Sequence, residues 1–277
     1  MNVVIAGMGL IGGSVALALR AARPDVEIVG VDRAAVLTTD AVKRLASRLI
    51  DAADADSVDA AFERSDLVVL AAPVRVIVEL VPRALAAAPL VTDCGSTKRS
   101  IAAAADACSR RGRFVPGHPM AGAREGGAEH ARAELFADRR WLICPEKSDR
   151  AATEAVEALV KSFGAVPVQL GIAEHDRAVA RTSHATQLVT SALAVAASDA
   201  SAERAAGPAF EGATRAAGGS EAIWSDIFAS NADEIANALG EIVGELERVR
   251  AGLTRSPPDV DAARALLGRA KQARRGH

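Results

Sequence analysis

The sequence predicts an α/β protein in which a doubly wound, mostly parallel sheet is followed by an all-helical domain. Short β-branched runs alternate with alanine-rich helical stretches in the first part of the chain, a pattern typical of a parallel sheet covered by helices. After Leu170 the strand signals stop and the pattern becomes helical. A length of 277 residues suits two domains, which we place at 1–170 and 171–277.

The composition narrows the class of protein. Aromatic residues make up only 3% of the chain and tyrosine is absent, which favours helix-rich packing. The formal net charge is -2, and the sequence shows none of the clustered basic residues that would bind the phosphates of a nucleic acid. We therefore expect no nucleic-acid partner. The expected strands are Val3-Ile5, Val26-Val31, Leu67-Leu70, Leu90-Thr92, Phe114-Val115, Trp141-Cys144 and Val166-Leu170.

The cysteines indicate a reducing compartment. Cys94, Cys108 and Cys144 are odd in number and widely separated, so neither a disulfide framework nor a metal site fits them. We expect reduced thiols, no metal and a cytoplasmic location. The uncharged segment from Val3 to Leu19 lacks a basic leader and contains four glycines, so we interpret it as strand, turn and helix and expect no membrane partner.

A glycine-rich motif follows the first expected strand and opens a helix. In Gly7-Met8-Gly9-Leu10-Ile11-Gly12, Gly7 permits a tight turn, Gly9 lets the backbone approach a pyrophosphate, and Gly12 allows close packing of helix and strand. Leu10 and Ile11 begin the helix, whose N-terminus faces the anion. The alternative is a purely structural glycine turn. We favour dinucleotide binding and a Rossmann-type sheet.

The choice of dinucleotide depends on the end of the second strand. Asp32 lies twenty residues beyond Gly12, where a carboxylate accepts hydrogen bonds from ribose hydroxyls and repels a 2′-phosphate. This favours NAD over NADP, although Arg33 beside it could tolerate the phosphate. We also assign Ala72 and Pro73, just after the Leu67-Leu70 strand, to the cofactor site.

Two candidate catalytic groups follow later strands. Ser96 lies in TDCGSTK (92–98), where a fourth expected strand passes into a helix; it either reaches into the cleft or simply caps that helix. His118 in FVPGHPMAG (114–122) comes just past the next strand. A histidine there can remove a proton from an alcohol near neutral pH, although a lone loop histidine is often structural.

Two helical segments carry patterns of their own. Asp176, Ser183, Gln187 and Thr190 form one polar stripe with His184 at its edge, which we expect to line the cleft rather than face solvent. His175-Asp176 could merely start that helix. Apolar residues spaced alternately four and three apart form a seam that packs either within its own domain or in a homodimer; they are Ile235, Leu239, Ile242, Leu246, Val249 and Leu253.

The motifs occur in an order that resembles the prephenate and arogenate dehydrogenase family, from Met1 to about Leu253. The glycine motif is shared with many oxidoreductases, whereas HPMAG after GSTK, followed by the HD and SH pairs, is specific. The motifs are GMGLIGGS at 7–14, TDCGSTK at 92–98, HPMAG at 118–122, His175-Asp176 with Ser183-His184, and Arg215 with Trp224-Ser225-Asp226-Ile227-Phe228.

The resemblance implies oxidative decarboxylation of a cyclohexadienyl substrate in tyrosine biosynthesis, giving 4-hydroxyphenylpyruvate from prephenate or tyrosine from arogenate. Hydride leaves ring C4 for NAD, the C4 hydroxyl loses its proton, and the ring carboxylate leaves as carbon dioxide. It further implies that His118 is the general base, that Ser96 orients the hydroxyl, and that Arg215 binds a substrate carboxylate. Trp224 is either a core or a site-lining residue.

Two departures from the family pattern concern the substrate. Gln187 stands where many prephenate-preferring members have a second histidine, and a neutral amide supplies no cation for a pyruvyl carboxylate. Arg124 occupies the usual place of an acidic residue, and Glu125 follows it. Either residue could contact substrate. Prephenate, arogenate and 4-amino-4-deoxyprephenate all remain open.

Two other functions compete with this one. A hydroxyacid dehydrogenase or imine reductase shares the layout but usually relies on a lysine or other groups of the helical domain, and the segment 171–253 contains no lysine. A non-catalytic NAD-sensing relative would bind cofactor without turnover. The combination of Ser96, His118 and Arg215 argues against it.

Overall fold

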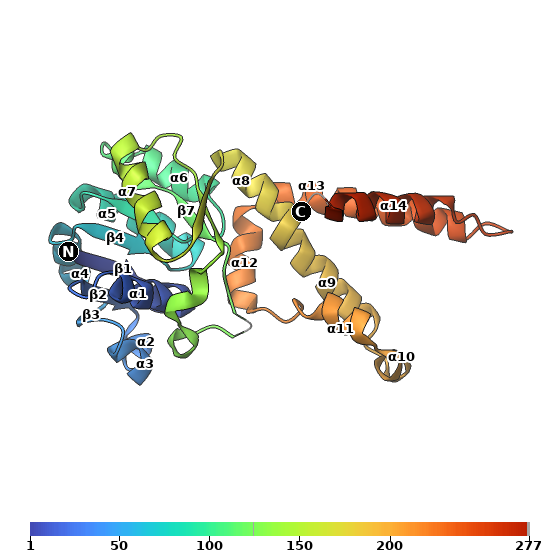
Figure 1. The fold of residues 1–277 in the computed structure, drawn as a ribbon, viewed down its shortest axis with the longest axis horizontal. Coiled ribbons are helices and arrows are strands. Elements are labelled where there is room, and N and C mark those ends of the chain that lie inside the picture. The colour runs from blue at the N-terminus through green and yellow to red at the C-terminus, as the bar shows by residue number, and fades with distance from the viewer. Residues whose placement is uncertain (124, 276–277) are drawn as a thin grey trace.

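The computed structural model describes residues 1–123 and 125–275, and it separates into an α/β lobe and a helical extension (Figure 1). Six strands of the lobe form one parallel sheet in the order β3-β2-β1-β4-β5-β6. These strands are β1 (Asn2–Ala6), β2 (Glu27–Asp32), β3 (Arg48–Asp51), β4 (Leu67–Leu70), β5 (Val91–Asp93) and β6 (Phe114–Val115). The order reverses direction between β1 and β4, which is where doubly wound sheets bind their ligands.

A separate sheet of three strands, β7-β8-β9, adjoins the first. It consists of β7 (Gly117–Pro119), β8 (Arg140–Ile143) and β9 (Val166–Gln169). β7 runs antiparallel to β8, and β8 runs parallel to β9. The expected fold class, a mostly parallel doubly wound sheet followed by helices, is therefore confirmed, and this small mixed sheet is an addition to it.

Two details of the expected strand order were wrong. Strand β3 was missed because its four residues contain only Leu49 and Ile50 as an apolar signal. The TDCGSTK segment therefore follows the fifth strand and not the fourth. In addition, His118 lies within β7, opposite Leu142 of β8, and not in a loop past a strand end.

Helices cover both faces of the large sheet. Val3 and Ile5 of β1 belong to one apolar cluster, whereas Val4 and Ala6 belong to the cluster on the opposite face, so β1 is buried on both sides. The helices of the lobe are α1 (Leu10–Ala22), α2 (Ala34–Leu37), α3 (Asp40–Lys43), α4 (Ala55–Glu63), α5 (Val74–Ala87), α6 (Arg99–Asp106) and α7 (Arg150–Ser162), with short 3-10 turns η1 (Arg111–Arg113), η2 (Ala128–His130) and η3 (Ala133–Phe136).

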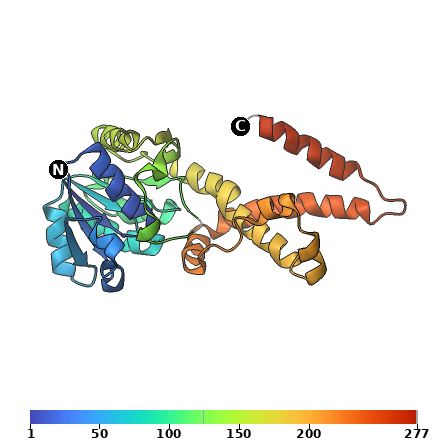
Figure 2. The ribbon, with the colours of Figure 1, turned by 60° about the horizontal axis from the view of Figure 1, so that its bottom comes forward.

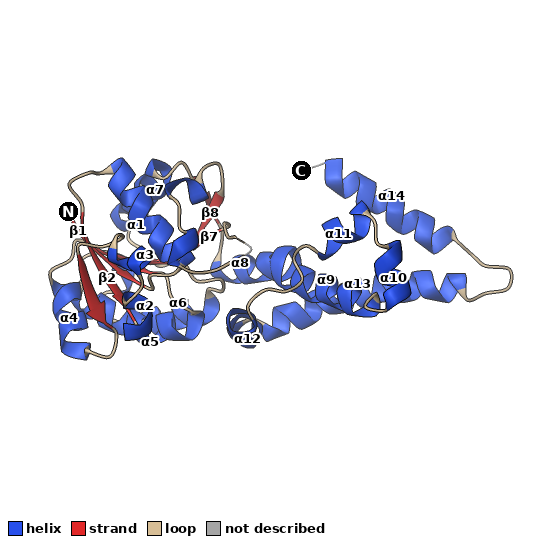
Figure 3. Ribbon diagram, turned by 90° about the horizontal axis from the view of Figure 1, so that it is seen from below, coloured by secondary structure: helices blue, strands red, loops and turns tan. Residues whose placement is uncertain are grey.

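The second part of the chain is helical and extends away from the lobe (Figure 3). Its elements are α8 (Ile172–Val179), the π-helical turn η4 (Ala180–His184), α9 (Ala185–Ala196), α10 (Ala200–Ala205), α11 (Pro208–Thr214), α12 (Glu221–Ser230), α13 (Ala232–Leu253) and α14 (Asp261–Arg275). α14 returns from the far end of α13 (Figure 2). The buried apolar cluster of this part is small and consists of Ala180, Ala185, Ile235 and Ala238.

The apolar seam of α13 is only partly covered by its own chain. Ile235 is 5% exposed, whereas Leu246 is 55% and Leu253 is 50% exposed. The first half of the seam thus packs within the chain, and the second half carries apolar side chains that face outward. Among the helices of residues 1–123 and 125–275, none has the length and apolar character needed to cross a bilayer.

The π-helical turn changes which side chains share a face. A regular helix turns by about 100° per residue, so side chains eight positions apart, such as Asp176 and His184, would diverge by about 80°. One residue inserted by a π turn removes most of that difference. The expected stripe assumed an unbroken helix; the structure instead buries Asp176, His184 and Gln187 and leaves Ser183 half-buried.

Candidate active site

The glycine-rich loop has the conformation that a dinucleotide requires. Gly7 has a φ of 100°, and a Cβ there would lie 2.8 Å from the backbone nitrogen of Ala72, so the β1–α1 and β4–α5 loops touch. A Cβ on Gly12 would lie 1.8 Å from the carbonyl oxygen of Gly7. At Gly9, the N-cap of α1, a Cβ would meet nothing within 4 Å. Space is therefore open where a pyrophosphate would approach the helix N-terminus.

The remaining expected cofactor residues surround this loop. Asp32 ends β2 and accepts hydrogen bonds from the backbone nitrogens of Met8 and Arg33, each at 2.7 Å. Its carboxylate therefore braces the glycine loop from the side where a ribose would bind. Leu10 and Ile11 begin α1 and are half-buried, the Arg33 side chain is exposed, half-buried Ala72 follows β4, and Pro73 is the N-cap of α5.

His118 and Ser96 are placed by the same loop, which joins β5 to α6. The Gly117 nitrogen donates to Asp93 Oδ1 at 3.1 Å, and Lys98 Nζ donates to the Gly117 oxygen at 2.7 Å. These contacts hold β7, with His118, beside the loop that carries half-buried Ser96. Because α6 begins at Arg99 with Lys98 as its N-cap, the alternative that Ser96 caps this helix was wrong.

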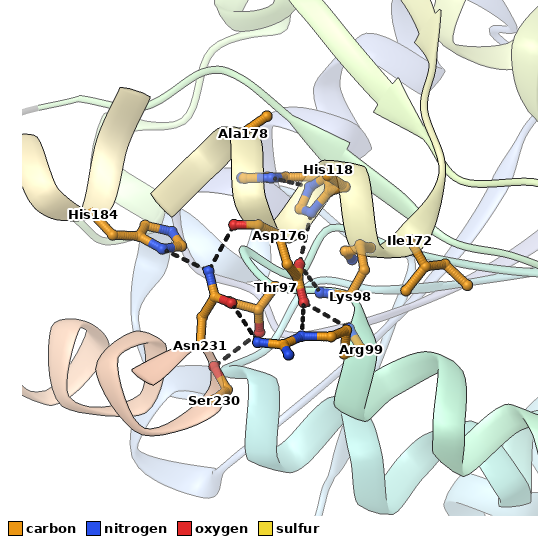
Figure 4. Close-up of polar contacts among 12 residues, drawn as sticks. Thr97, Lys98, Arg99, His118, Ile172, Asp176, Ala178, His184, Ser230 and Asn231 are labelled. Carbon is orange, nitrogen blue, oxygen red and sulfur yellow. Dashed lines mark hydrogen bonds and ion pairs between the residues drawn. The ribbon is translucent and has the colours of Figure 1, made fainter. Parts of the chain in front are cut away.

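Two residues of the helical part complete a hydrogen-bonded chain with His118 (Figure 4). His118 Nδ1 lies 2.9 Å from His175 Nε2, and His175 Nδ1 lies 2.8 Å from Asp176 Oδ1. His175 and Asp176 are both fully buried. They do not merely start the helix, because α8 begins three residues earlier, at Ile172.

The Asp176 carboxylate is held by donors at the start of α6. It accepts the backbone N–H groups of Lys98 at 2.7 Å and Arg99 at 2.9 Å, and Arg99 Nε lies at 3.3 Å. Burial alone would raise the pKa of Asp176, but the hydrogen bonds from His175, Arg99 and Lys98 outweigh it and hold the pKa below its ordinary value. Asp176 is therefore an ionised acceptor.

The histidines of this site are neutral at physiological pH. Burial, reinforced by repulsion from His175 and His184 in their protonated forms and from Lys98, holds the pKa of His118 well below its ordinary value. Burial also lowers the pKa of His175, although its hydrogen bond to Asp176 acts in the opposite direction. A neutral imidazole has a lone pair on one nitrogen and can act as a base.

His184 forms a second wall of the site. Its Nδ1 lies 3.3 Å from Asn231 Nδ2, and its ring meets Trp224 edge-on with centroids 6.1 Å apart. Burial lowers the pKa of His184 to about 4, with Asp176 opposing and His175 reinforcing that effect. Trp224 is half-buried and stacks on Phe228, and Gln187 is buried one turn beyond His184.

Several polar contacts dock the helical part onto the lobe at this point. Arg99 pairs with Asp233 and donates from Nη2 to Asn231 Oδ1 at 2.9 Å. Asn231 Nδ2 in turn donates to the Asp176 carbonyl at 2.8 Å. Asp226 of α12 accepts the Arg75 backbone N–H, in the first turn of α5, at 3.1 Å. The catalytic candidates therefore lie at the junction of the two parts.

The other expected substrate residues lie apart from this cluster. Arg215 follows α11, which packs against α9, and its side chain is exposed. Glu125 is exposed and its Oε2 lies 3.2 Å from His130 Nε2. Arg124 lies outside the described residues.

Sequence reasoning missed the roles of His175 and Asp176 as partners of His118, and it missed Arg99 and Asn231 altogether. The adjacent His-Asp pair was the one local signal, since an imidazole beside a carboxylate is a common orienting arrangement. Its connection to His118 spans 57 positions, and periodicity carries no information on such a contact.

Comparisons with known proteins agree on one family. The family described as "Prephenate dehydrogenase, nucleotide-binding domain" matches residues 15–169, and "Prephenate dehydrogenase, dimerization domain" matches residues 172–265. Prephenate dehydrogenase of Bacillus subtilis is 32% identical over 260 residues, which cover 90% of this chain and 69% of that protein. Cyclohexadienyl dehydrogenase of Zymomonas mobilis is 27% identical over 270 residues, which cover 93% of this chain and 90% of that protein.

A solved structure extends this likeness to the fold. Prephenate dehydrogenase from A. aeolicus, in complex with hydroxyphenyl propionate and NAD+, has a TM-score of 0.86 and 25% identity. The superposition covers 100% of this chain and 98% of that one.

Proposed function

The chain belongs to the prephenate dehydrogenase family, and from this we propose that it oxidises and decarboxylates prephenate or arogenate with NAD in tyrosine biosynthesis. The observation that carries the proposal is the position of His118. A neutral imidazole is held on β7 beside the loop at the carboxyl end of β5, in a chain whose glycine-rich loop suits a dinucleotide.

The residues at the carboxyl ends of β1, β2 and β4 fit NAD. Gly9 leaves open space at the N-terminus of α1 for the pyrophosphate, and the Asp32 carboxylate suits ribose hydroxyls and repels a 2′-phosphate. We assign the remaining contacts to Gly7, Leu10, Ile11, Gly12, Arg33, Ala72 and Pro73. When bound, NAD supplies the hydride acceptor.

His118 receives the hydroxyl proton in this proposal. As hydride leaves ring C4, the O–H bond of the C4 hydroxyl breaks and an N–H bond forms on the imidazole. The electrons of the breaking C–C bond to the ring carboxylate then enter the ring, and carbon dioxide leaves. Ser96, on the neighbouring loop, donates or accepts a hydrogen bond that orients the hydroxyl.

Substrate recognition falls to the helical part. We assign Arg215 to a substrate carboxylate, because an exposed guanidinium can bind one in bidentate geometry. Ser183, His184, Gln187 and Trp224 would line the pocket together with Glu125, which follows β7. Arg124, outside the described residues, is assigned to substrate from the sequence alone. Buried Gln187 offers an amide and no positive charge, and His184, with its pKa of about 4, is neutral as well. The keto group of prephenate and the amino group of arogenate would therefore be distinguished by hydrogen bonding and not by a cationic side chain at these two positions.

The domain organisation and assembly follow from the same features. We place the boundary between 170 and 171, after β9 and before α8, and we propose a homodimer formed through the helical domain. Leu246 and Leu253 of α13 and Leu193 of α9 are 55%, 50% and 42% exposed, which leaves apolar area for a second copy to cover.

One set of assays tests the activity. Purified protein is given prephenate or arogenate, each with NAD or NADP, and NADH or NADPH is followed by absorbance. We expect turnover with NAD and a markedly lower rate with NADP. His118→Asn should lose turnover and keep its affinity for NAD. Cofactor binding without turnover on either substrate would contradict the proposal, and full activity of His118→Asn would remove His118 as the base.

A further inference from the structure

The hydrogen-bonded chain from Asp176 to His118 fixes which nitrogen of each ring carries a proton. Asp176 accepts three N–H groups, one from Lys98 and two from Arg99, and its Oδ1 lies 2.8 Å from His175 Nδ1. An ionised carboxylate has no proton to donate, so His175 Nδ1 must carry the hydrogen of that contact. Because neutral His175 has one N–H, its Nε2 holds a lone pair and accepts from His118.

It follows that His118 donates from Nδ1 to His175 Nε2, across 2.9 Å. Neutral His118 then has its lone pair on Nε2. The ring is also fixed in orientation, because the donor Nδ1 is tied to a fully buried partner while β7 holds the backbone. Nε2 is therefore the nitrogen left free to receive a proton.

We propose that His175 and Asp176 are positioning residues that hold His118 in the Nδ1–H tautomer, with Nε2 as the base. The proposal rests on the proposed function. When the substrate O–H bond breaks and the proton joins Nε2, His118 becomes an imidazolium whose Nδ1–H still donates to His175. The polarised chain, ending on the carboxylate, stabilises that positive charge.

The same contacts make the tautomer depend on docking of the helical part. His175 and Asp176 belong to α8, whereas His118 is on β7 and the donors to Asp176 are at the start of α6. If α8 separated from α6, His118 would lose its acceptor and both tautomers would become accessible. The tautomer of His118, a residue of the α/β lobe, is thus fixed by His175 and Asp176 of the helical part.

Nitrogen NMR of the wild-type enzyme tests the tautomer directly. In protein labelled with 15N-histidine, the His118 signals, assigned by their loss in His118→Asn, should show a protonated Nδ1 and an unprotonated Nε2 at pH 7.5. A protonated Nε2 would overturn the proposal without any variant of the positioning residues. Other charged or titratable side chains face the hydrogen-bonded chain from Asp176 to His118, namely Lys98, Asp93, Arg99 and His184. All spectra are therefore compared at one pH, so that the protonation of these groups is the same in each.

Two variants test the consequence for catalysis. Asp176→Asn removes the negative charge at the end of the hydrogen-bonded chain. In either orientation its NH2 group also faces a backbone N–H, of Lys98 or of Arg99, so the support of His175 is weakened. We expect kcat to fall by about 10²-fold or more, with the Kd for NAD little changed. In His175→Phe the ring is kept and the acceptor is lost, so kcat should also fall, whereas His175→Gln, whose side-chain oxygen accepts a hydrogen bond, should recover part of the loss.

The controls separate this proposal from the proposed function. Circular dichroism and NAD titration confirm that each variant is folded, and if Asp176→Asn does not fold, the histidine variants and the NMR spectra still decide. Wild-type kcat in folded His175→Phe, together with an inactive His118→Asn, would overturn the positioning role alone. An active His118→Asn would instead overturn the role of His118 itself.

Discussion

Lys98 and Asp93 form an ion pair in which both side chains are fully buried. The pair holds both backbone polar groups of Gly117, because Lys98 Nζ donates to its oxygen at 2.7 Å and Asp93 Oδ1 accepts from its nitrogen at 3.1 Å. Gly117 precedes His118 on β7. The ion pair therefore sets the position of the strand that carries the proposed base.

We predict that Lys98→Met strongly destabilises the protein. It leaves Asp93 as a buried, uncompensated charge, which costs about 3–5 kcal/mol of unfolding free energy. Urea unfolding followed by circular dichroism measures the loss. The double variant Lys98→Met with Asp93→Asn removes the charge and should recover part of it. An unchanged midpoint in Lys98→Met would contradict this account.

We predict that two alanine substitutions in the glycine loop separate folding from cofactor binding. A Cβ at position 12 would collide with the Gly7 carbonyl, so Gly12→Ala should lower the melting temperature. At position 9 the Cβ meets nothing within 4 Å, so Gly9→Ala should melt near the wild type. It should nevertheless weaken NAD binding about tenfold or more in calorimetry, since the methyl group occupies the space for the pyrophosphate. Equal NAD affinity in Gly9→Ala and wild type would argue against this binding site.

The glycine loop and its partner Asp32 could be predicted from sequence because their pattern is local. A turn, a helix start and a strand end within about thirty residues suffice to place them. Strand β3 could not, since Leu49 and Ile50 carry too little signal and its place depends on pairing with β2. His118 was identified as a candidate, but its placement inside β7 depends on Leu142 of β8.

The hydrogen-bonded chain from His118 through His175 to Asp176 could not be predicted from the sequence, for a different reason. Their contact exists because α8 docks on the start of α6, where Lys98 and Arg99 offer free backbone N–H groups to Asp176. Helical periodicity also fails beyond the π turn, which brings His184 toward Asn231. Neither the docking of two helices nor a one-residue insertion can be predicted from side-chain patterns with a period of 3.6 residues.

We predict an acid limit on activity that lies below the ordinary histidine range. The pKa of His118 is lowered by burial, so the base stays neutral as pH falls through about 6.5. The value of kcat/KM should therefore hold from pH 7.5 to 6.5 and decline only at lower pH. Steady-state rates in a constant-ionic-strength buffer measure this. A decline centred above pH 6.5 would show that another group controls the reaction.

We predict that stability also falls with acid, in part because of His184. Its pKa is lowered from 6.5 to about 4, so between these values the unfolded chain binds a proton that the folded protein excludes. Stability is then lost as pH falls from 6.5, at up to about 1.4 kcal/mol per pH unit for one such group. In urea titrations His184→Gln should show a shallower decline over this window, relative to its own value at pH 7.5. An unaltered slope would contradict the assignment.

We predict that the outward half of the α13 seam holds a dimer together. Leu246 and Leu253 are 55% and 50% exposed in the single chain, and a second copy that covers them would remove this apolar area from water. Light scattering should give a dimer for the wild type and a monomer for the double variant Leu246→Glu with Leu253→Glu, because a buried carboxylate opposes association. Glu247→Gln, an exposed change on the same helix, is the matched control and should remain dimeric. A wild type that is monomeric at every concentration would rule out this surface as a stable interface.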